Sequence, residues 1–289
     1  MGNRKKSSKR SLLPIIALLP MLAAAPPALA TDGGVALTGV SAAIDGRIAA
    51  MDDPARIAEG RLFLPAAPLA RQFDGAVDWE PHEEKMTIRT ADGRTIAMRI
   101  GVPVATVDGT RYLMDAAPFL ADGRTYLPIR YFAAFLSVDV EWRADERLAS
   151  FRTLAPGEDA VSGFLRAAEP YAEEELQLLA KLVQVEAGYE SYEGQLAIAN
   201  VILNRVKDPR FPATIRDVIY AGKQFPPAHN GLLDASEPGE IALRAARDAL
   251  DGKNNVEDAV YFYNPDVTSG SFWDALDVVA SYENHNFAK

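Results

Sequence analysis

The residue in this sequence that is best placed to take part in a reaction is Glu186, a carboxylate among apolar residues. Between positions 173 and 187 the apolar residues recur every three or four positions, which predicts an amphipathic helix. Glu186 falls on its apolar face, close to the helix end predicted at Gly188. A carboxyl group removed from water has a raised pKa and can give a proton to a leaving oxygen near neutral pH. The apolar face is formed by Leu176, Leu179, Ala180, Val183 and Ala187.

Helical position alone leaves the role of Glu186 open. It favours a structural carboxylate, because ion pairs and solvent-exposed helix ends also place glutamates on such faces. The turn that follows carries two further acids, Glu190 and Glu193, which we expect to be solvated. Ser191 is placed to cap a second helix, whose apolar residues we expect in the core.

Composition excludes several classes of function. The formal net charge of −10 makes nucleic acid a poor partner. Without cysteine, the chain has no disulfide, no thiol nucleophile and no thiolate metal site. Its histidines, His82, His229 and His285, lack the spacing of a zinc motif, and no serine-hydrolase elbow or phosphate-binding glycine loop is present. We expect no cofactor, no metal and a monomeric protein.

Residues 1–30 have the layout of a secretory signal peptide. Basic residues precede an apolar run from Leu12 to Ala25, and the small-x-small sequence Ala28–Ala30 precedes Thr31. Two prolines interrupt the run, which falls short of the roughly 20 apolar residues of a spanning helix. We therefore expect cleavage near Thr31 and release outside the membrane.

An internal repeat organises the next part of the chain. "GRLFLPAAPLARQFDGAVDWEPHEEKMTIRT" (60–90) aligns without a gap to "GRTYLPIRYFAAFLSVDVEWRADERLASFRT" (123–153). Each copy predicts a strand ending at Leu-Pro, a helical turn and a hairpin that carries Val-x-Trp. Between the copies, Asp108-Gly109 predicts a further tight hairpin.

This repeated unit, over residues 35–154, resembles the copper amine oxidase N-terminal-like domain, a stalk module of secreted proteins from Gram-positive bacteria. Despite that family name we expect no copper, because His82 is the only histidine in this half and copper sites need several imidazoles or a thiolate. We interpret the domain as a spacer or a contact to cell-wall or spore-coat proteins.

The second half resembles the catalytic domain of the SleB/CwlJ cell-wall hydrolases, the spore-cortex-lytic enzyme family. The resemblance rests on "VEAGYESYEGQLAIANVILNRV", "FPATIRDVIY", "KQFPPAHNG" and "AVYFYNP", which follow one another in the family's order and extend over residues 173–288. In that family the glutamate of the Glu-Ala motif is the catalytic acid, and it falls on Glu186. The Pro226-Pro227 pair departs from the small polar residues that usually follow Gln-Phe.

The resemblance also suggests substrate contacts in the second half. Gln195 is placed to reach a sugar N-acetyl group, and Phe225 offers an apolar platform for a sugar ring. Tyr261, Tyr263 and Asn264 can line a carbohydrate cleft, although strand alternation buries part of that run. His285 matches a terminal histidine of the family, and a lone histidine there can equally be structural.

The predicted fold class is α+β, with a β-rich stalk domain followed by a mainly helical domain with a small β element. The resemblance implies that the helical domain is lysozyme-like. We expect a signal peptide at 1–30, the stalk at 31–154, a linker at 155–172 and the hydrolase at 173–289. The expected place of action is the cell wall or spore cortex.

The expected reaction is cleavage of the β-1,4 bond between N-acetylmuramic acid and N-acetylglucosamine in peptidoglycan. Because hydrolysis normally uses two carboxylates and only Glu186 is placed by a motif, the sequence favours a lytic transglycosylase. One alternative is a muramidase or glucosaminidase with Glu190 or Glu193 as second carboxylate. The other is a wall-binding protein without turnover.

Overall fold

The computed structural model describes residues 35–49, 53–155, 164–222 and 224–289. The predicted signal peptide and the central part of the predicted linker lie outside these residues. No helix in the described ranges is long and apolar enough to cross a membrane. The described residues contain two hydrophobic cores, one in the β-rich half and one in the helical half.

The two copies of the repeat fold into the same order of elements, as predicted. β5 and β12 pair antiparallel with Leu64 opposite Leu127, which are equivalent residues of the two copies. The copies are therefore related locally by an approximate two-fold axis. They consist of β5 (Arg61–Pro65), α1 (Ala66–Arg71), β6 (Ala76–Glu80) and β7 (Lys85–Arg89), and of β12 (Arg124–Pro128), α2 (Ile129–Leu136), β13 (Val138–Arg143) and β14 (Leu148–Thr153).

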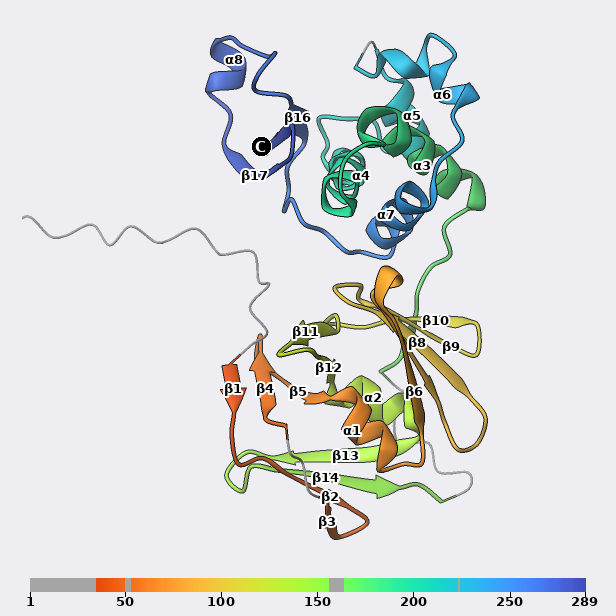
Figure 1. Cartoon of the computed structure of the whole chain (residues 1–289), viewed down its shortest axis with the longest axis vertical. Coiled ribbons are helices and arrows are strands. Elements are labelled where there is room, and N and C mark those ends of the chain that lie inside the picture. The colour runs from red at the N-terminus through yellow and green to blue at the C-terminus, as the bar shows by residue number, and fades with distance from the viewer. Residues whose placement is uncertain (1–34, 50–52, 156–163, 223) are drawn as a thin grey trace, which may run out of the picture. The chain divides into compact units, whose positions relative to one another are not determined.

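The described strands of this half form three sheets (Figure 1). One has the order β1 (Val35–Leu37), β4 (Ala55–Ala58), β5, β12, β11 (Phe119–Ala121). The second has the order β15 (Arg166–Ala167), β10 (Thr110–Leu113), β9 (Val104–Val107), β8 (Thr95–Arg99), β7, β6. The third has the order β13, β14, β2 (Ser41–Ile44), β3 (Arg47–Ala49), and a 3-10 turn η1 (Pro81–Glu83) joins β6 to β7. At the predicted Asp108-Gly109 turn both residues have positive φ, 48° and 82°, which a tight turn between β9 and β10 requires.

The second half is mainly helical and ends in a small sheet with the order β16, β18, β17 (Figure 1). The predicted fold class, a β-rich half followed by a helical half with a small β element, is therefore confirmed. Its elements are α3 (Glu173–Ala187), α4 (Tyr192–Lys207), α5 (Ile215–Tyr220), η2 (Pro226–Ala228), α6 (Leu232–Ala235), α7 (Glu240–Leu250), β16 (Tyr261–Tyr263), α8 (Ser271–Asp274), β17 (Val278–Tyr282) and β18 (His285–Ala288).

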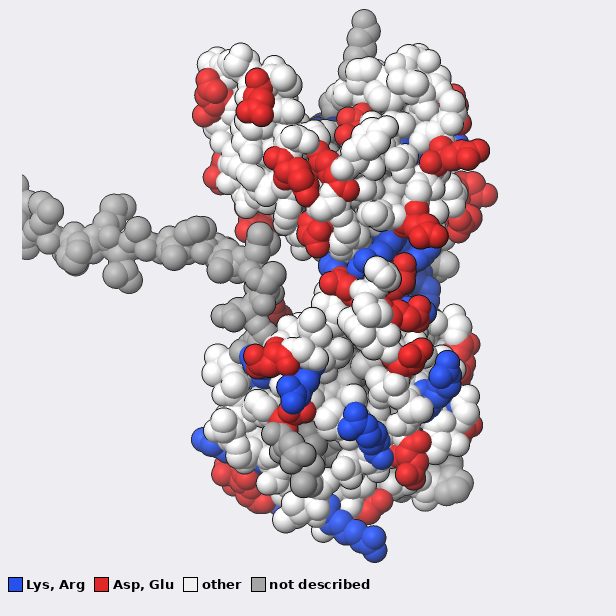
Figure 2. Space-filling view, viewed as in Figure 1, with Lys and Arg blue, Asp and Glu red and all other residues white. Residues whose placement is uncertain are grey.

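Local sequence signals account for the α3–α4 pair. The Ser191 hydroxyl caps α4 by accepting a hydrogen bond from the Gly194 backbone at 3.3 Å. All five residues of the apolar stripe predicted on α3 are buried. On the face drawn in Figure 2, acidic side chains outnumber basic ones over the helical elements. Such a surface would repel a phosphate backbone.

Candidate active site

Glu186 lies one position before the end of α3, and its side chain is half-buried. Burial raises the pKa of Glu186 above the ordinary value of a glutamate, while the charge of His285 acts in the opposite direction and lowers it. The carboxyl group is thus partly accessible to solvent and tends to keep its proton, and both are properties of a general acid.

Glu190 and His285 form a largely buried pair near Glu186. His285 Nδ1 lies 2.7 Å from Glu190 Oε1, and the two side chains are 16% and 7% exposed. The expectation that Glu190 is solvated is therefore wrong, because β18 brings His285 against the turn between α3 and α4. Glu193, in contrast, is exposed as expected.

Gly194 allows two carboxylates to approach the start of α4. A Cβ atom at this position would lie 2.6 Å from Glu190 Oε2 and 2.7 Å from Glu283 Oε2, closer than such contacts occur. Glu283 comes from the turn between β17 and β18. The absence of a side chain at Gly194 therefore lets the inter-helix turn and the final hairpin meet.

Gln195 fixes the backbone of the same turn. Its side chain is 2% exposed, and its Nε2 donates a hydrogen bond to the Glu190 carbonyl at 2.9 Å. Its Oε1 is buried without a hydrogen-bond partner among the described residues. Gln195 therefore positions Glu190, while its predicted contact to a sugar N-acetyl group stays a prediction.

Phe225 is a core residue in the structure, not the exposed sugar platform that the sequence suggested. Its side chain is 2% exposed and stacks on Phe262, with ring centroids 6.3 Å apart. The Arg205 guanidinium lies 5.4 Å from its ring centroid and donates to Gln224 Oε1 at 2.6 Å. The Gln-Phe motif therefore ties its loop to α4 instead of offering an aromatic face to solvent.

An aromatic cluster surrounds Tyr261 and Tyr263, which are both half-exposed on β16. Tyr261 packs edge-on against Phe272 at 5.6 Å, and Tyr263 lies 5.0 Å from Trp273, measured between ring centroids. Phe272 is 53% exposed. Sequence reasoning missed Phe272 and Trp273, although adjacent aromatic residues in a Gly- and Ser-containing segment were a usable signal. Asn264 begins the next turn, where its Oδ1 accepts a hydrogen bond from the Asp266 backbone at 2.9 Å.

The structure thus brings Glu186, Glu190, Gln195 and His285 together, although they come from opposite ends of the helical half. Phe262 connects this group to β16, because its ring packs edge-on against His285 with centroids 5.5 Å apart. Among the residues that the structure describes, no three histidine, cysteine, aspartate or glutamate side chains are grouped to hold a metal ion. The half-buried Glu186 carboxyl, whose pKa is raised, can supply proton transfer to this group of residues.

Comparison with known proteins gives a family match for each half of the chain. Residues 189–288 match the cell wall hydrolase family and residues 43–150 match the copper amine oxidase N-terminal domain. Glu186 lies just before the first of these ranges.

Two curated relatives are spore cortex-lytic enzymes. The protein from Halalkalibacterium halodurans is 41% identical over 104 residues, which are 36% of this chain and 31% of that protein. The protein from Bacillus subtilis is 41% identical over 103 residues, which are 36% of this chain and 33% of that protein. The match thus spans about a third of each of these relatives.

A solved structure, the catalytic domain of the Bacillus cereus SleB protein, is 33% identical, with a TM-score of 0.40. The match covers 42% of this chain and 94% of that one. The family matches and the sequence motifs agree on which half carries which domain. Residues 189–288 belong to the cell wall hydrolase family, and residues 43–150 to the copper amine oxidase N-terminal domain family.

Proposed function

We propose that the helical half cleaves the glycan strands of peptidoglycan at the β-1,4 bond that follows N-acetylmuramic acid, as a lytic transglycosylase. The observation that carries this proposal is the half-buried Glu186 carboxyl, whose pKa is raised by burial. We place the activity outside the cytoplasmic membrane, as the signal layout of residues 1–30 predicts. The substrate is spore cortex or wall peptidoglycan.

In the proposed reaction Glu186 acts twice. The protonated carboxyl gives its proton to the glycosidic oxygen, and the bond between this oxygen and the anomeric carbon breaks. The 6-hydroxyl group of the muramoyl residue then forms a bond to the same anomeric carbon, and the Glu186 carboxylate takes the hydroxyl proton. The enzyme returns to its starting protonation state, and the product carries a 1,6-anhydro ring.

Glu190 is the stronger candidate for a second carboxylate, because it is buried whereas Glu193 is exposed. A hydrolytic mechanism would use Glu190 to activate water or to attack the sugar. However, one Glu190 oxygen is held by His285 at 2.7 Å, and its backbone carbonyl is held by Gln195. These contacts favour a positioning role, in which Glu190 keeps His285 beside Glu186.

The aromatic cluster of Tyr261, Tyr263, Phe272 and Trp273 is our proposed glycan platform. Sugar rings present flat apolar faces to aromatic side chains, and Phe272 offers a largely exposed one. Phe262 links this cluster to His285. Because side chains alternate along a strand, β16 carries the platform on one face and, through Phe262, the contact to His285 on the other.

Incubation with purified sacculi tests the proposed function. We expect soluble muropeptides whose peptide stems are intact, because the cleaved bond is glycosidic. Free peptides without glycan would show that another bond is cut. Binding to sacculi without release would support the alternative of a wall-binding protein without turnover.

The pH dependence of this release should respond to His285. Glu186 must be protonated to act as an acid, so activity should fall as pH rises through its raised pKa. His285→Gln removes the charge that lowers this pKa. The alkaline limit of activity should therefore move to higher pH, whatever the maximal rate becomes.

The measurement is the rate of sacculus clearing across pH, with His82→Gln as the matched control because His82 is an exposed histidine of the stalk. The control should keep the wild-type profile. An alkaline limit that stays in place or moves to lower pH in His285→Gln would contradict the assignment of His285 as the charge acting on Glu186.

A further inference from the structure

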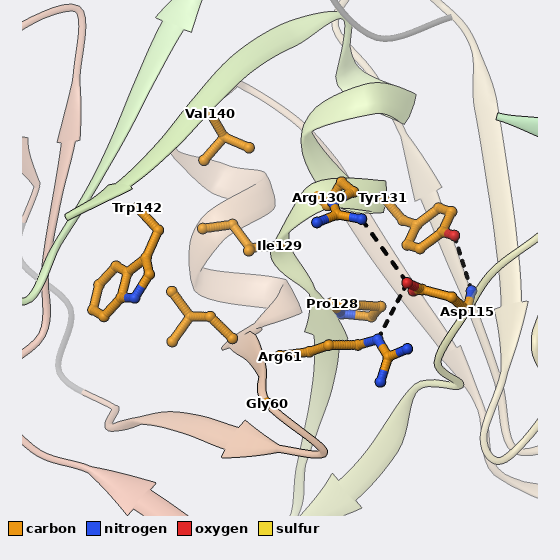
Figure 3. A pocket seen from close by; sticks show the side chains of 10 residues that line it. Gly60, Arg61, Asp115, Pro128, Ile129, Arg130, Tyr131, Val140 and Trp142 are labelled. Atoms are coloured by element: carbon orange, nitrogen blue, oxygen red, sulfur yellow. Dashed lines mark hydrogen bonds and ion pairs between the residues drawn. The ribbon is translucent and has the colours of Figure 1, made fainter. Parts of the chain in front are cut away.

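The β-rich half contains a cavity of about 300 Å³ where the two copies of the repeat meet (Figure 3). Arg61, at the start of β5, comes from the first copy, and Arg130, Val140 and Trp142 come from the second. Asp115, from the segment between them, completes the polar side. This volume lies at the lower end of the range for small-ligand sites, which runs from about 300 to 1,000 Å³.

Among the residues that line the cavity, one carboxylate lies near two guanidinium groups, and Arg61 also pairs with Glu59, outside the lining, at 3.4 Å. Asp115 Oδ2 lies 3.2 Å from Arg61 Nε but 3.9 Å from an Arg130 terminal nitrogen, beyond hydrogen-bond distance. The Asp115 backbone donates to the Tyr131 hydroxyl at 2.9 Å, which fixes this segment against α2. The Arg130 side chain is 65% exposed, and such pairs contribute little stability. The Arg130 guanidinium also lies 5.6 Å from the Phe164 ring centroid, a contact that leaves its N–H groups able to bind a second acid.

The opposite side of the cavity is apolar. Ile129, Val140 and Trp142 face the arginine side in Figure 3. Ile129 is buried and Trp142 is half-exposed, so the indole presents part of its surface to the cavity. The cavity thus combines an arginine that has no carboxylate within hydrogen-bond distance, Arg130, with a small apolar wall. This combination fits a ligand with a carboxylate next to a small apolar group.

The other copy of the repeat provides an internal comparison. Arg124 is equivalent to Arg61 and pairs with Asp53, Nε to Oδ1, at 2.6 Å. The residues equivalent to Ile129 and Arg130 are Ala66 and Ala67. The arginine–aspartate pair and the Val-x-Trp residues are thus kept in both copies, whereas the second cation, Arg130, and the bulkier Ile129 occur only at the cavity. These features therefore exceed what the repeat needs to fold.

We propose that this cavity binds the free carboxylate of a short peptide with small apolar residues, as found in the peptide stems of cell walls. Arg130 binds the carboxylate, and the apolar side chain of the terminal residue packs against Ile129, Val140 and Trp142. Asp115 accepts a hydrogen bond from the peptide backbone. The inference relies on the proposed function only for the wall as the source of the peptide. On this proposal the stalk domain binds the free ends of peptide stems that are not crosslinked.

Calorimetric titration of the purified protein with N-acetyl-D-alanyl-D-alanine tests the proposal, because this probe has a free carboxylate and no glycan. The free acid should bind at least about tenfold more tightly than its C-terminal amide, since a charge-assisted hydrogen bond is lost in the amide. Arg130→Gln should abolish this preference. Arg124→Gln, which changes the arginine that pairs with Asp53 outside the cavity, should retain the preference for the free acid.

Equal binding of acid and amide, no binding of the acid, or an unchanged preference in Arg130→Gln would overturn the proposal. If N-acetyl-L-alanyl-L-alanine binds as tightly as the D,D dipeptide, the cavity does not select cell-wall peptides, and the wall is overturned as the source of the ligand. Muropeptide release by the same variants distinguishes the two proposals. If Arg130→Gln loses the dipeptide and still releases muropeptides, both stand; a wild type that binds the dipeptide without release refutes only the glycosidase.

Discussion

Glu186→Gln should reduce the release of muropeptides from sacculi by roughly a hundredfold or more, because glutamine keeps the shape of the side chain but cannot transfer a proton. The variant should still fold and bind sacculi. The matched control is Glu193→Gln, which changes an exposed glutamate in the adjoining turn and should keep most of the activity. Full activity in Glu186→Gln would show that Glu186 is a structural carboxylate.

The same substitution should stabilise the protein at pH values above the raised folded-state pKa of Glu186. The folded-state pKa of Glu186 is raised, so folding disfavours the ionised form. For such a group the favourable contribution is complete below the unfolded pKa and is lost as pH rises through the folded value. Thermal unfolding of Glu186→Gln and wild type should therefore coincide in acid, while the variant should melt at higher temperature in alkali. A lower melting temperature at alkaline pH would contradict the desolvation of Glu186.

Glu190→Ala should lower both stability and activity. The variant leaves the buried His285 Nδ1 without its acceptor, which costs about 1–3 kcal/mol of unfolding free energy. The turn that follows Glu186 would also lose its contact to β18, so the rate of release should fall at least about tenfold, as when the position of a catalytic group, here Glu186, is disturbed. Denaturant unfolding and sacculus clearing measure the two effects.

Two further variants separate the effect of the Glu190–His285 contact from the effect of removing a carboxylate at this place. Glu283→Ala changes an exposed carboxylate next to the same glycine and should alter stability by less than about 0.5 kcal/mol. Glu190→Gln retains an acceptor for His285 and should recover part of the lost stability. If Glu190→Ala unfolds at the wild-type denaturant concentration, the pair with His285 does not stabilise the turn.

Local patterns predicted the elements that carry the site. The three-to-four residue periodicity placed Glu186 on the buried face of α3, and the serine after the turn caps α4. The gapless repeat predicted two strand–helix–hairpin units, which the structure confirms. The helix signals are contained within a few residues, and the repeat appears when two segments of the same chain are aligned, so a single sequence is sufficient to detect both.

Contacts between distant residues were beyond the reach of local patterns. Glu190 and His285 are 95 positions apart, and nothing in the turn sequence shows that β18 will cover it. The burial of Phe225 also depends on distant residues, because nothing in its proline-rich loop predicts the contacts to Phe262 and Arg205. The aromatic cluster around Tyr263 likewise depends on α8 folding back onto β16.

The mass of the new glycan ends is the most direct test of the proposed mechanism. Muropeptides released from sacculi by the wild-type protein should end in 1,6-anhydro-N-acetylmuramic acid, lighter by one water than the hydrolytic product, and should resist borohydride reduction. This result would show that the muramoyl 6-hydroxyl group, with Glu186 as acid and base, attacks the anomeric carbon. Ends that carry the extra water and are reducible would contradict it, and would assign the attack to water in a two-carboxylate reaction of Glu186 and Glu190.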